Sequence, residues 1–173
     1  RDLPVLSEIA LTYDCQNRCT FCYADAPQRG KKVRAMSTAE TRAIIDRIYD
    51  EAHCPTVSFT GGEPTLRGDL PELVAYAKGK GMRVNLITNG LRCADEAFVA
   101  ALAGAGLDSA QVSVEGGSAA ELYDSIQRLY AMPGETRLFM CHDYMPGGRP
   151  LAFETTVDEQ KRSNVQIDAR TTR

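Results

Sequence analysis

Residues 15–23 read Cys15-Gln16-Asn17-Arg18-Cys19-Thr20-Phe21-Cys22-Tyr23, with three cysteines separated by three and then by two residues. On a short loop after an apolar strand, three such thiols can turn toward one point and bind an iron-sulfur cluster as thiolates. Three thiolates leave one iron of a four-iron cluster open, and a small molecule can react there, as at the open position of a catalytic zinc. Taken alone, the cysteines also fit a zinc site or part of a ferredoxin-like site.

Strand and helix patterns alternate along the chain on both sides of this stretch. The strand patterns occupy residues 8–13, 56–60, 83–88 and 109–114. Helices are predicted to start at the capping box Ser37-Thr38-Ala39-Glu40, at Asp69 and at Asp95. Residues 25–35 are polar and contain Pro27 and Gly30, so an extended loop is expected there. Strands that alternate with helices predict parallel β-α units in an α/β fold.

Two further polar segments contain glycine and follow predicted strands. Gly61-Gly62-Glu63-Pro64 comes after the second strand, and Asn89-Gly90 comes after the third. Gly61 and Gly62 allow the backbone to turn tightly and to approach a ligand closely. Ligands of β/α barrels bind at the C-terminal ends of the strands, where the cysteine loop also lies. The three segments are therefore predicted to share one site.

The cysteine spacing, with the aromatic Phe21 before the last cysteine, resembles the signature of the radical S-adenosylmethionine (radical SAM) enzymes. Later segments match this family in order and spacing: Thr60-Gly61-Gly62-Glu63-Pro64, Ile87-Thr88-Asn89-Gly90 and Val112-Ser113-Val114-Glu115-Gly116. The resemblance runs from Glu8 to Gly116 and is closest to the Gly-Gly-Glu-Pro type of peptide-modifying and cofactor-maturing enzymes. It implies a partial (β/α)6-type barrel with parallel strands.

The resemblance also implies a chemistry for the cysteine loop. Cys15, Cys19 and Cys22 would bind a 4Fe-4S cluster whose fourth iron is chelated by S-adenosylmethionine. The reduced cluster would cleave this molecule to a 5′-deoxyadenosyl radical, which takes a hydrogen atom from the substrate. An electron donor such as flavodoxin or ferredoxin is implied as a partner.

The family pattern further implies which residues contact the cofactor. The expected contacts are Phe21, Tyr23, Gly61, Gly62, Glu63, Thr88, Asn89 and Ser113. The glycine segment resembles the one that hydrogen-bonds the methionine amino group, and the third-strand pair resembles residues near the ribose and methionine. The two aromatic residues correspond to those that flank the adenine. Without the family, the Asn-Gly pair reads as a simple turn and the aromatic pair as core residues.

The chain departs from the family pattern after Gly116. A strand predicted over residues 137–141 and a turn at Pro146-Gly147-Gly148-Arg149 leave five strands where the family has six. We therefore expect one β-α unit to be absent between Gly117 and Glu121. A segment omitted from the sequence is favoured over a smaller barrel, because a missing interior strand would leave unpaired edges on both neighbours.

Outside the motifs, the expected division of the chain is a barrel over residues 1–150 and an incomplete or partly ordered extension over residues 151–173. Residues 164–170 are a candidate for one further strand in this extension. Three cysteines outside the loop are expected to be buried free thiols: Cys54, Cys93 and Cys141. His142 is expected to be a packed residue rather than a base.

The substrate is set by parts of the chain that the motifs do not cover. Maturation of a ribosomally made peptide is favoured, with a tetrapyrrole or small-molecule cofactor as the alternative substrate. A non-catalytic iron-sulfur or zinc module is the alternative from another class, and His53 or Cys54 would then supply a fourth zinc ligand. An activating subunit that makes a glycyl radical on a partner is a third alternative.

Composition limits the classes of partner. The 173 residues carry a net charge of −3 and 43% hydrophobic residues, as in an ordinary soluble globular protein. The sequence lacks the excess of basic residues that would predict a nucleic-acid surface. It also has no apolar run as long as a membrane span or a signal-peptide core. We therefore expect a cytoplasmic protein that binds neither nucleic acid nor a membrane, with cysteines that serve as ligands or buried thiols.

Overall fold

A computed structural model describes residues 3–19, 22–30, 32–113, 119–139, 148–150, 152, 154–164, 167 and 171. The chain forms two compact units, Arg1–Ser113 and Val114–Arg173. The cysteine loop, the glycine segment and the Asn89-Gly90 turn all belong to the first unit. The division expected after residue 150 lies inside the second unit and stays a prediction.

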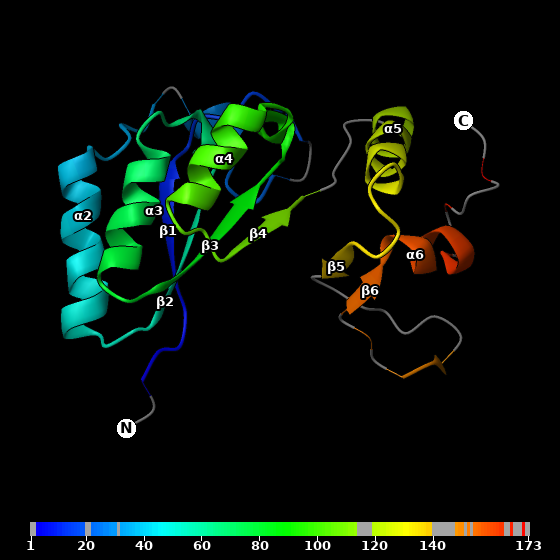
Figure 1. The fold of residues 1–173 in the computed structure, drawn as a ribbon. Helices are drawn as coiled ribbons and strands as arrows, with labels where there is room; N and C mark the ends of the chain where they lie inside the picture. The colour runs from blue at the N-terminus through cyan, green and yellow to red at the C-terminus, as the bar shows by residue number, and fades with distance from the viewer. Residues whose placement is uncertain are drawn as a thin grey trace. The chain divides into compact units, whose positions relative to one another are not determined.

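Four parallel strands form the sheet of the first unit (Figure 1). They are β1 (Ser7–Thr12), β2 (Thr56–Gly61), β3 (Arg83–Thr88) and β4 (Ser109–Val112), in that spatial order. The register pairs Ile9 with Phe59 and Phe59 with Leu86. This arrangement confirms the predicted parallel β-α units. It also brings the C-terminal ends of the strands, and the segments that follow them, to one edge of the sheet.

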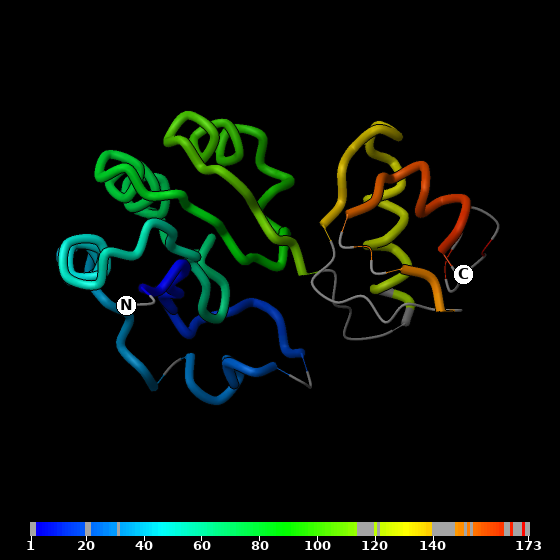
Figure 2. Tube along the Cα trace, turned by 90° about the horizontal axis from the view of Figure 1, so that it is seen from below, coloured from blue at the N-terminus to red at the C-terminus, as the bar shows by residue number. Residues whose placement is uncertain are grey.

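Three helices of the first unit cover one face of this sheet. They are α2 (Thr38–Asp46), α3 (Leu70–Gly79) and α4 (Glu96–Gly104), and a π-helical turn, η1 (Arg47–Glu51), extends α2. Figure 2 shows the helices following one another along one side of the strands. The segment after β1, which carries the cysteines, runs on the other side. The helices therefore leave the second face of the sheet open to this segment.

Two of the three predicted helix starts carry the expected cap. The Ser37 hydroxyl accepts a hydrogen bond from Glu40 N, and the Glu40 carboxylate accepts one from Ser37 N, which completes the capping box of α2. Asp95 caps α4 by accepting a hydrogen bond of 3.2 Å from the helix backbone. Asp69 precedes α3 but does not cap it, because both of its carboxylate oxygens bind the Arg67 guanidinium.

One predicted loop contains a helix. The short helix α1 (Ala26–Arg29) lies within residues 25–35, where an extended loop was expected, so that prediction was wrong. Pro27 belongs to the first turn of α1. There its fixed φ suits the helix, and its missing N–H removes no intrahelical hydrogen bond. The residue taken as a loop signal is therefore a helix-start signal.

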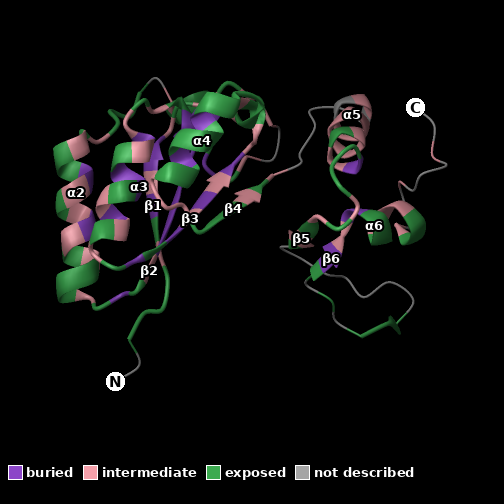
Figure 3. Ribbon diagram, viewed as in Figure 1, coloured by how far each residue is buried: buried purple, intermediate pink, exposed green. Residues whose placement is uncertain are grey.

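Apolar side chains on the helix-covered face of the sheet form the core (Figure 3). The strand residues in it are Ile9, Leu11, Val57, Phe59, Val84 and Leu86, none more than 4% exposed. They belong to one buried cluster with the helix residues Ile45, Leu73, Val74 and Leu102. Successive strand residues point to opposite faces, so every second residue enters this core. Burial of apolar surface, worth about 25 cal/mol per Å², makes this face the main source of stability.

The opposite face of the sheet, called here the inner face, carries a row of polar side chains. Glu8, Ser58, Asn85 and Ser109 are neighbours in register across the four strands. Asn85 Nδ2 donates to Ser58 Oγ at 3.0 Å, and Ser109 Oγ donates to Asn85 Oδ1 at 2.9 Å. The inner face is therefore polar where the outer face is apolar.

The capping box of α2 leads to a pH-dependent prediction. Arg34 donates two hydrogen bonds of 2.8 and 2.7 Å to the Glu40 carboxylate, and this guanidinium, with the Ser37 N–H, lowers the pKa of Glu40 to about 2. A carboxyl with a depressed folded-state pKa adds stability above its unfolded-state pKa, and this stability is lost as the pH falls through the folded-state value. Urea unfolding should therefore show a loss of stability between about pH 4.5 and 2 that a Glu40→Gln variant lacks. Equal losses in the two proteins would contradict the prediction.

The described residues of the second unit form two helices and two short strands. They are α5 (Ala119–Tyr130), β5 (Arg137–Phe139), β6 (Glu154–Thr156) and α6 (Val157–Ser163). β5 pairs antiparallel with β6, and Arg137 binds Glu154 across the pair. The strand predicted at residues 137–141 is therefore part of a separate two-stranded sheet and not a fifth parallel strand. Its partner β6 has three residues, too few to show an alternation pattern in the sequence.

Several predicted features lie outside the described residues. They are Phe21, residues 114–118, Cys141, His142, Pro146-Gly147 and most of the strand candidate at residues 164–170. Among the helices in the described part of the chain, none is both long enough and apolar enough to cross a membrane.

Candidate active site

The turn after β2 lies directly against the chain that leads into the cysteine loop. Gly62 N donates to Thr12 O at 2.7 Å, and Glu63 N donates to Asp14 O at 2.8 Å. A Cβ on Gly61 would lie 2.1 Å from Thr12 O, and one on Gly62 would lie 2.4 Å from Asp14 O. Gly61 also has a φ of +138°, which side-chain-bearing residues rarely adopt. Only glycine therefore allows the two segments to approach this closely.

The Glu63 carboxylate joins the ends of β2 and β3. Its side chain is 0% exposed. Oε1 accepts hydrogen bonds from Thr65 N at 3.0 Å, Thr65 Oγ1 at 2.6 Å and Thr88 Oγ1 at 2.7 Å. Oε2 accepts a hydrogen bond of 2.7 Å from Asn89 N. Four donors compensate for burying the carboxylate, so Glu63 fixes the segment that follows β3.

Glu63 thus has a role that its motif did not reveal. The sequence predicts a contact between this residue and the methionine amino group, and that contact stays a prediction. Thr65 was not singled out at all, although it supplies two of the four donors to Glu63. The signal was present in Glu63-Pro64-Thr65, because an acidic residue before a proline is a common start of a helical turn. Here it starts the 3₁₀ turn η2 (Pro64–Leu66).

The three predicted ligand cysteines are half-buried free thiols on one loop. Cys15 Sγ lies 3.4 Å from Asn17 N and 4.0 Å from Asn89 Nδ2, and both nitrogens donate to it. Burial raises the pKa of Cys15, and the nearby Glu63 and Cys22 raise it further. Because thiolates are the iron ligands, metal binding at Cys15 must displace a proton.

These cysteines fit an iron-sulfur cluster by their chemistry. The sulfur donors are in no disulfide and lie on the side of the sheet that the helices leave open (Figure 2), and Cys15 has a backbone and a side-chain N–H group beside its sulfur. Among the described residues no three metal-ligating side chains already form a closed group. The loop therefore supplies the sulfur donors that a cluster needs, and metal binding would bring the three thiolates together.

His53 and Cys54 do not extend this donor set. Cys54 precedes β2, whereas the cysteine loop follows β1, so the two lie at opposite ends of parallel strands. Six strand residues at about 3.3 Å each separate these ends by roughly 20 Å. Cys54 is also fully buried, and its thiol donates to Thr56 O at 3.4 Å. The structure therefore contradicts the zinc alternative in which Cys54 is the fourth ligand.

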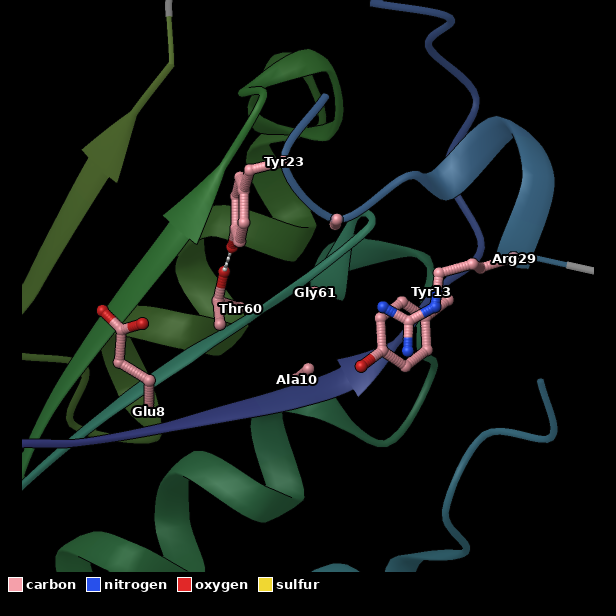
Figure 4. Close-up of a pocket in the computed structure, with 8 residues that line it drawn as sticks. Glu8, Ala10, Tyr13, Tyr23, Arg29, Thr60 and Gly61 are labelled. Atoms are coloured by element: carbon pink, nitrogen blue, oxygen red, sulfur yellow. Dashed lines mark hydrogen bonds between the residues drawn. The ribbon is translucent and has the colours of Figure 1, made fainter. Parts of the chain in front are cut away.

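A cavity of about 250 Å³ lies beside the cysteine loop on the inner face (Figure 4). Its lining residues are Glu8, Ala10, Tyr13, Tyr23, Ala24, Arg29, Thr60 and Gly61. Tyr23 is 80% exposed, and its hydroxyl forms a hydrogen bond of 2.9 Å with Thr60 Oγ1. The Arg29 guanidinium stacks over the Tyr13 ring, 4.0 Å from its centroid. Tyr23 is thus a wall of an open cavity and not a core aromatic.

The remaining predicted contacts are only partly described. Ser113 is half-buried, and its backbone N–H donates to Thr88 O at 2.8 Å, which holds the end of β4 next to β3. The cofactor contacts of Ser113 and Tyr23 stay predictions. Phe21 lies outside the described residues.

Arg67 is a further residue that sequence reasoning missed. Its side chain is only 11% exposed, and Nη1 donates to Leu11 O and Met36 O while Asp69 accepts its other donors. Arg67 therefore ties the end of β1 to the segments before α2 and α3. An arginine four residues after Glu63 gives no local signal, because its backbone acceptors lie far away in the sequence.

Known proteins match this chain over most of its length. The chain is 41% identical over 152 residues to Fe-coproporphyrin III synthase of Methanosarcina barkeri, which covers 87% of this chain and 36% of the relative. It is 34% identical to the mycofactocin maturase MftC of Mycolicibacterium smegmatis, over 73% of this chain and 31% of the relative. It is 36% identical to the PqqA peptide cyclase of Xanthomonas euvesicatoria, over 65% of this chain and 29% of the relative. The chain thus spans about a third of the length of these curated relatives.

The fold and the family agree. The structure of BtrN in complex with AdoMet and 2-DOIA superimposes with a TM-score of 0.57 at 21% identity, over 71% of this chain and 52% of that chain. The model of the radical SAM superfamily matches residues 9–137, a range that includes the cysteine loop and all three later motifs. The chain therefore belongs to the radical SAM superfamily.

Proposed function

We propose that this chain carries the cofactor site of a radical SAM enzyme and abstracts a hydrogen atom from its substrate. Radical SAM proteins use a 4Fe-4S cluster and S-adenosylmethionine. The observation that carries the proposal is the hydrogen-bond chain at the C-terminal ends of β1, β2 and β3. In it the Glu63 carboxylate binds Asn89 N, and Asn89 Nδ2 donates to Cys15 Sγ. The three segments that define the family thus meet at one edge of the sheet.

Each part of the site has a task in this proposal. Cys15, Cys19 and Cys22 would hold the cluster, which supplies one electron to cleave S-adenosylmethionine to a 5′-deoxyadenosyl radical. The backbone around Gly61 and Gly62 would lie close to the methionine end of the cofactor. The cavity beside Tyr23 would enclose another part of it. The substrate would enter over the inner face.

For the substrate we propose a ribosomally made peptide, the substrate class that the sequence favours. The relatives MftC and PqqA peptide cyclase are named as a maturase and a peptide cyclase, which supports this class. A tetrapyrrole is the second candidate, because the match to Fe-coproporphyrin III synthase covers 87% of this chain at 41% identity. Binding of Fe-coproporphyrin III, followed by its Soret absorbance, would support the tetrapyrrole. If the chain binds the porphyrin no more tightly than serum albumin does, the peptide remains the proposed substrate.

The test of the activity is the release of 5′-deoxyadenosine. The 173-residue chain is reconstituted with iron and sulfide under anaerobic conditions and then mixed with S-adenosylmethionine and dithionite. We expect slow release of 5′-deoxyadenosine even without substrate, and none when the reductant is left out. A loaded cluster with neither release nor binding of S-adenosylmethionine would overturn the proposal in favour of a non-catalytic iron-sulfur module.

A further inference from the structure

The side-chain amide of Asn89 has only one orientation that fits its neighbours. Its Oδ1 lies 3.1 Å from Leu91 N and 3.5 Å from Gln16 Nε2, and both of these nitrogens are donors. If the amide were turned over, its NH₂ group would face the backbone N–H of Leu91, which can only donate. The hydrogen-bond partners therefore assign oxygen to that side and nitrogen to the side of Cys15.

The backbone of Asn89 is held as firmly as its side chain. Its N–H donates to Glu63 Oε2 at 2.7 Å, inside the buried network that also includes Thr88. The next residue, Gly90, donates its N–H to Thr88 Oγ1 at 3.1 Å. A charge-assisted hydrogen bond to a fully buried carboxylate is among the stronger contacts in proteins. Asn89 therefore presents its Nδ2 donor to Cys15 Sγ from a fixed position, 4.0 Å away.

We propose that Asn89 donates a hydrogen bond to the sulfur of Cys15 and thereby raises the reduction potential of the cluster that Cys15 holds. The inference rests on the proposed function only for the identity of the cluster. A cluster ligand sulfur gains electron density on reduction, so an N–H donor stabilises the reduced state more than the oxidised state. The backbone N–H of Asn17 acts on the same sulfur at 3.4 Å, and Asn89 adds a donor from a different strand. Asn89 is thus a positioning and tuning residue of the metal site.

The decisive variant is Asn89→Asp. It keeps the oxygen that accepts from Leu91 N, and it replaces the donor with a second oxygen of negative charge. The matched control is Arg18→Gln, which changes the net charge by the same unit at an exposed position of the cysteine loop without touching Asn89. Exposed charges are screened by salt, so the control measures the effect of net charge, and Asn89→Ala, which adds no charge, measures the loss of the donor itself.

The measurement is the cluster midpoint potential, from an anaerobic titration followed by electron paramagnetic resonance. At a fixed potential we expect the ratio of reduced to oxidised clusters to be about tenfold lower in Asn89→Asp than in the native chain, which corresponds to a midpoint about 59 mV lower for a one-electron couple. The Arg18→Gln shift should be clearly smaller. Equal shifts in the two variants, or an unchanged potential in Asn89→Asp, would overturn the inference.

Two further observations keep the test decisive. If Asn89→Asp does not bind a full cluster, Asn89→Ala removes the donor without adding charge and should lower the potential by a smaller amount at unchanged iron content. An unchanged potential in that variant also overturns the inference. The potential is measured without S-adenosylmethionine, so a failure of this inference can be told apart from a failure of the proposed function. A native chain with a tuned cluster but no 5′-deoxyadenosine release would refute only the enzyme activity.

Discussion

Replacement of Cys19 by alanine is expected to remove both the cluster and the release of 5′-deoxyadenosine. Two thiolates remain on the loop, and Cys54 cannot replace the third, because it lies at the far end of β2. Iron and sulfide content should fall to a small fraction of the native value. Release of 5′-deoxyadenosine, measured by liquid chromatography, should fall to the level of a protein-free control.

The control for this experiment is Cys93→Ser. Cys93 is an exposed thiol in the 3₁₀ turn η3 (Leu91–Ala94), outside the cysteine loop, so the expectation that it is buried was wrong. Its replacement removes one thiol from the chain and should leave iron content and product release unchanged. A Cys19→Ala protein that loads iron as well as Cys93→Ser does would refute the assignment of Cys19 as a ligand.

Substitutions of Glu63 are expected to have the second largest effect. They should lower both the free energy of unfolding and the activity. Each carboxylate oxygen of Glu63 accepts a backbone N–H, from Thr65 for Oε1 and from Asn89 for Oε2. In a Glu63→Gln variant the new NH₂ group must therefore face one of these donors, whichever way the amide turns. The orientation that keeps the three hydrogen bonds of Oε1 places the NH₂ group against Asn89 N. We expect a loss of about 2 kcal/mol in the free energy of unfolding, because a buried donor is left unpaired.

Glu63→Ala removes the acceptor of all four bonds and should cost about 3 kcal/mol. Urea unfolding of the full chain measures both losses. The matched control is Glu72→Gln, since Glu72 is an exposed carboxylate that pairs with Arg42 at 2.7 Å. Such surface pairs contribute only about 0 to 1 kcal/mol. If Glu63→Gln is no less stable than Glu72→Gln, the carboxylate does not fix the segment after β3.

The first unit was predictable because its signals are local. The period-2 pattern of Ile9 and Leu11 marks β1, and the Ser37 capping box marks the start of α2. Parallel pairing follows from the alternation of strands and helices, and it brings the segments after the strands to one edge. These patterns depend on residues within a few positions of each other, which a single sequence displays.

The parts that escaped prediction depend on partners far along the chain. Glu63 reads as a solvated turn residue or a cofactor ligand, yet it is buried by contacts with Thr88 and Asn89, 25 and 26 residues later. Asp69 reads as a helix cap, but Arg67, which the distant Leu11 O and Met36 O hold in place, takes both of its oxygens. β5 reads as one more parallel strand, and its antiparallel partner β6 lies 17 residues on. Sequence patterns do not show which of several possible partners a polar group will find.

The contrast between the two faces of the sheet bears on how such proteins diversify. The outer face carries the folding free energy through residues such as Phe59 and Leu86, whereas Ser58, Asn85 and Ser109 on the inner face contribute little to the core. Substitutions at the exposed positions of the polar row, Glu8 and Ser109, should therefore leave the fold intact while they change what can lie against it. The chain matches relatives named as a peptide cyclase and as an Fe-coproporphyrin III synthase, which is the variety that such a division between the two faces would permit.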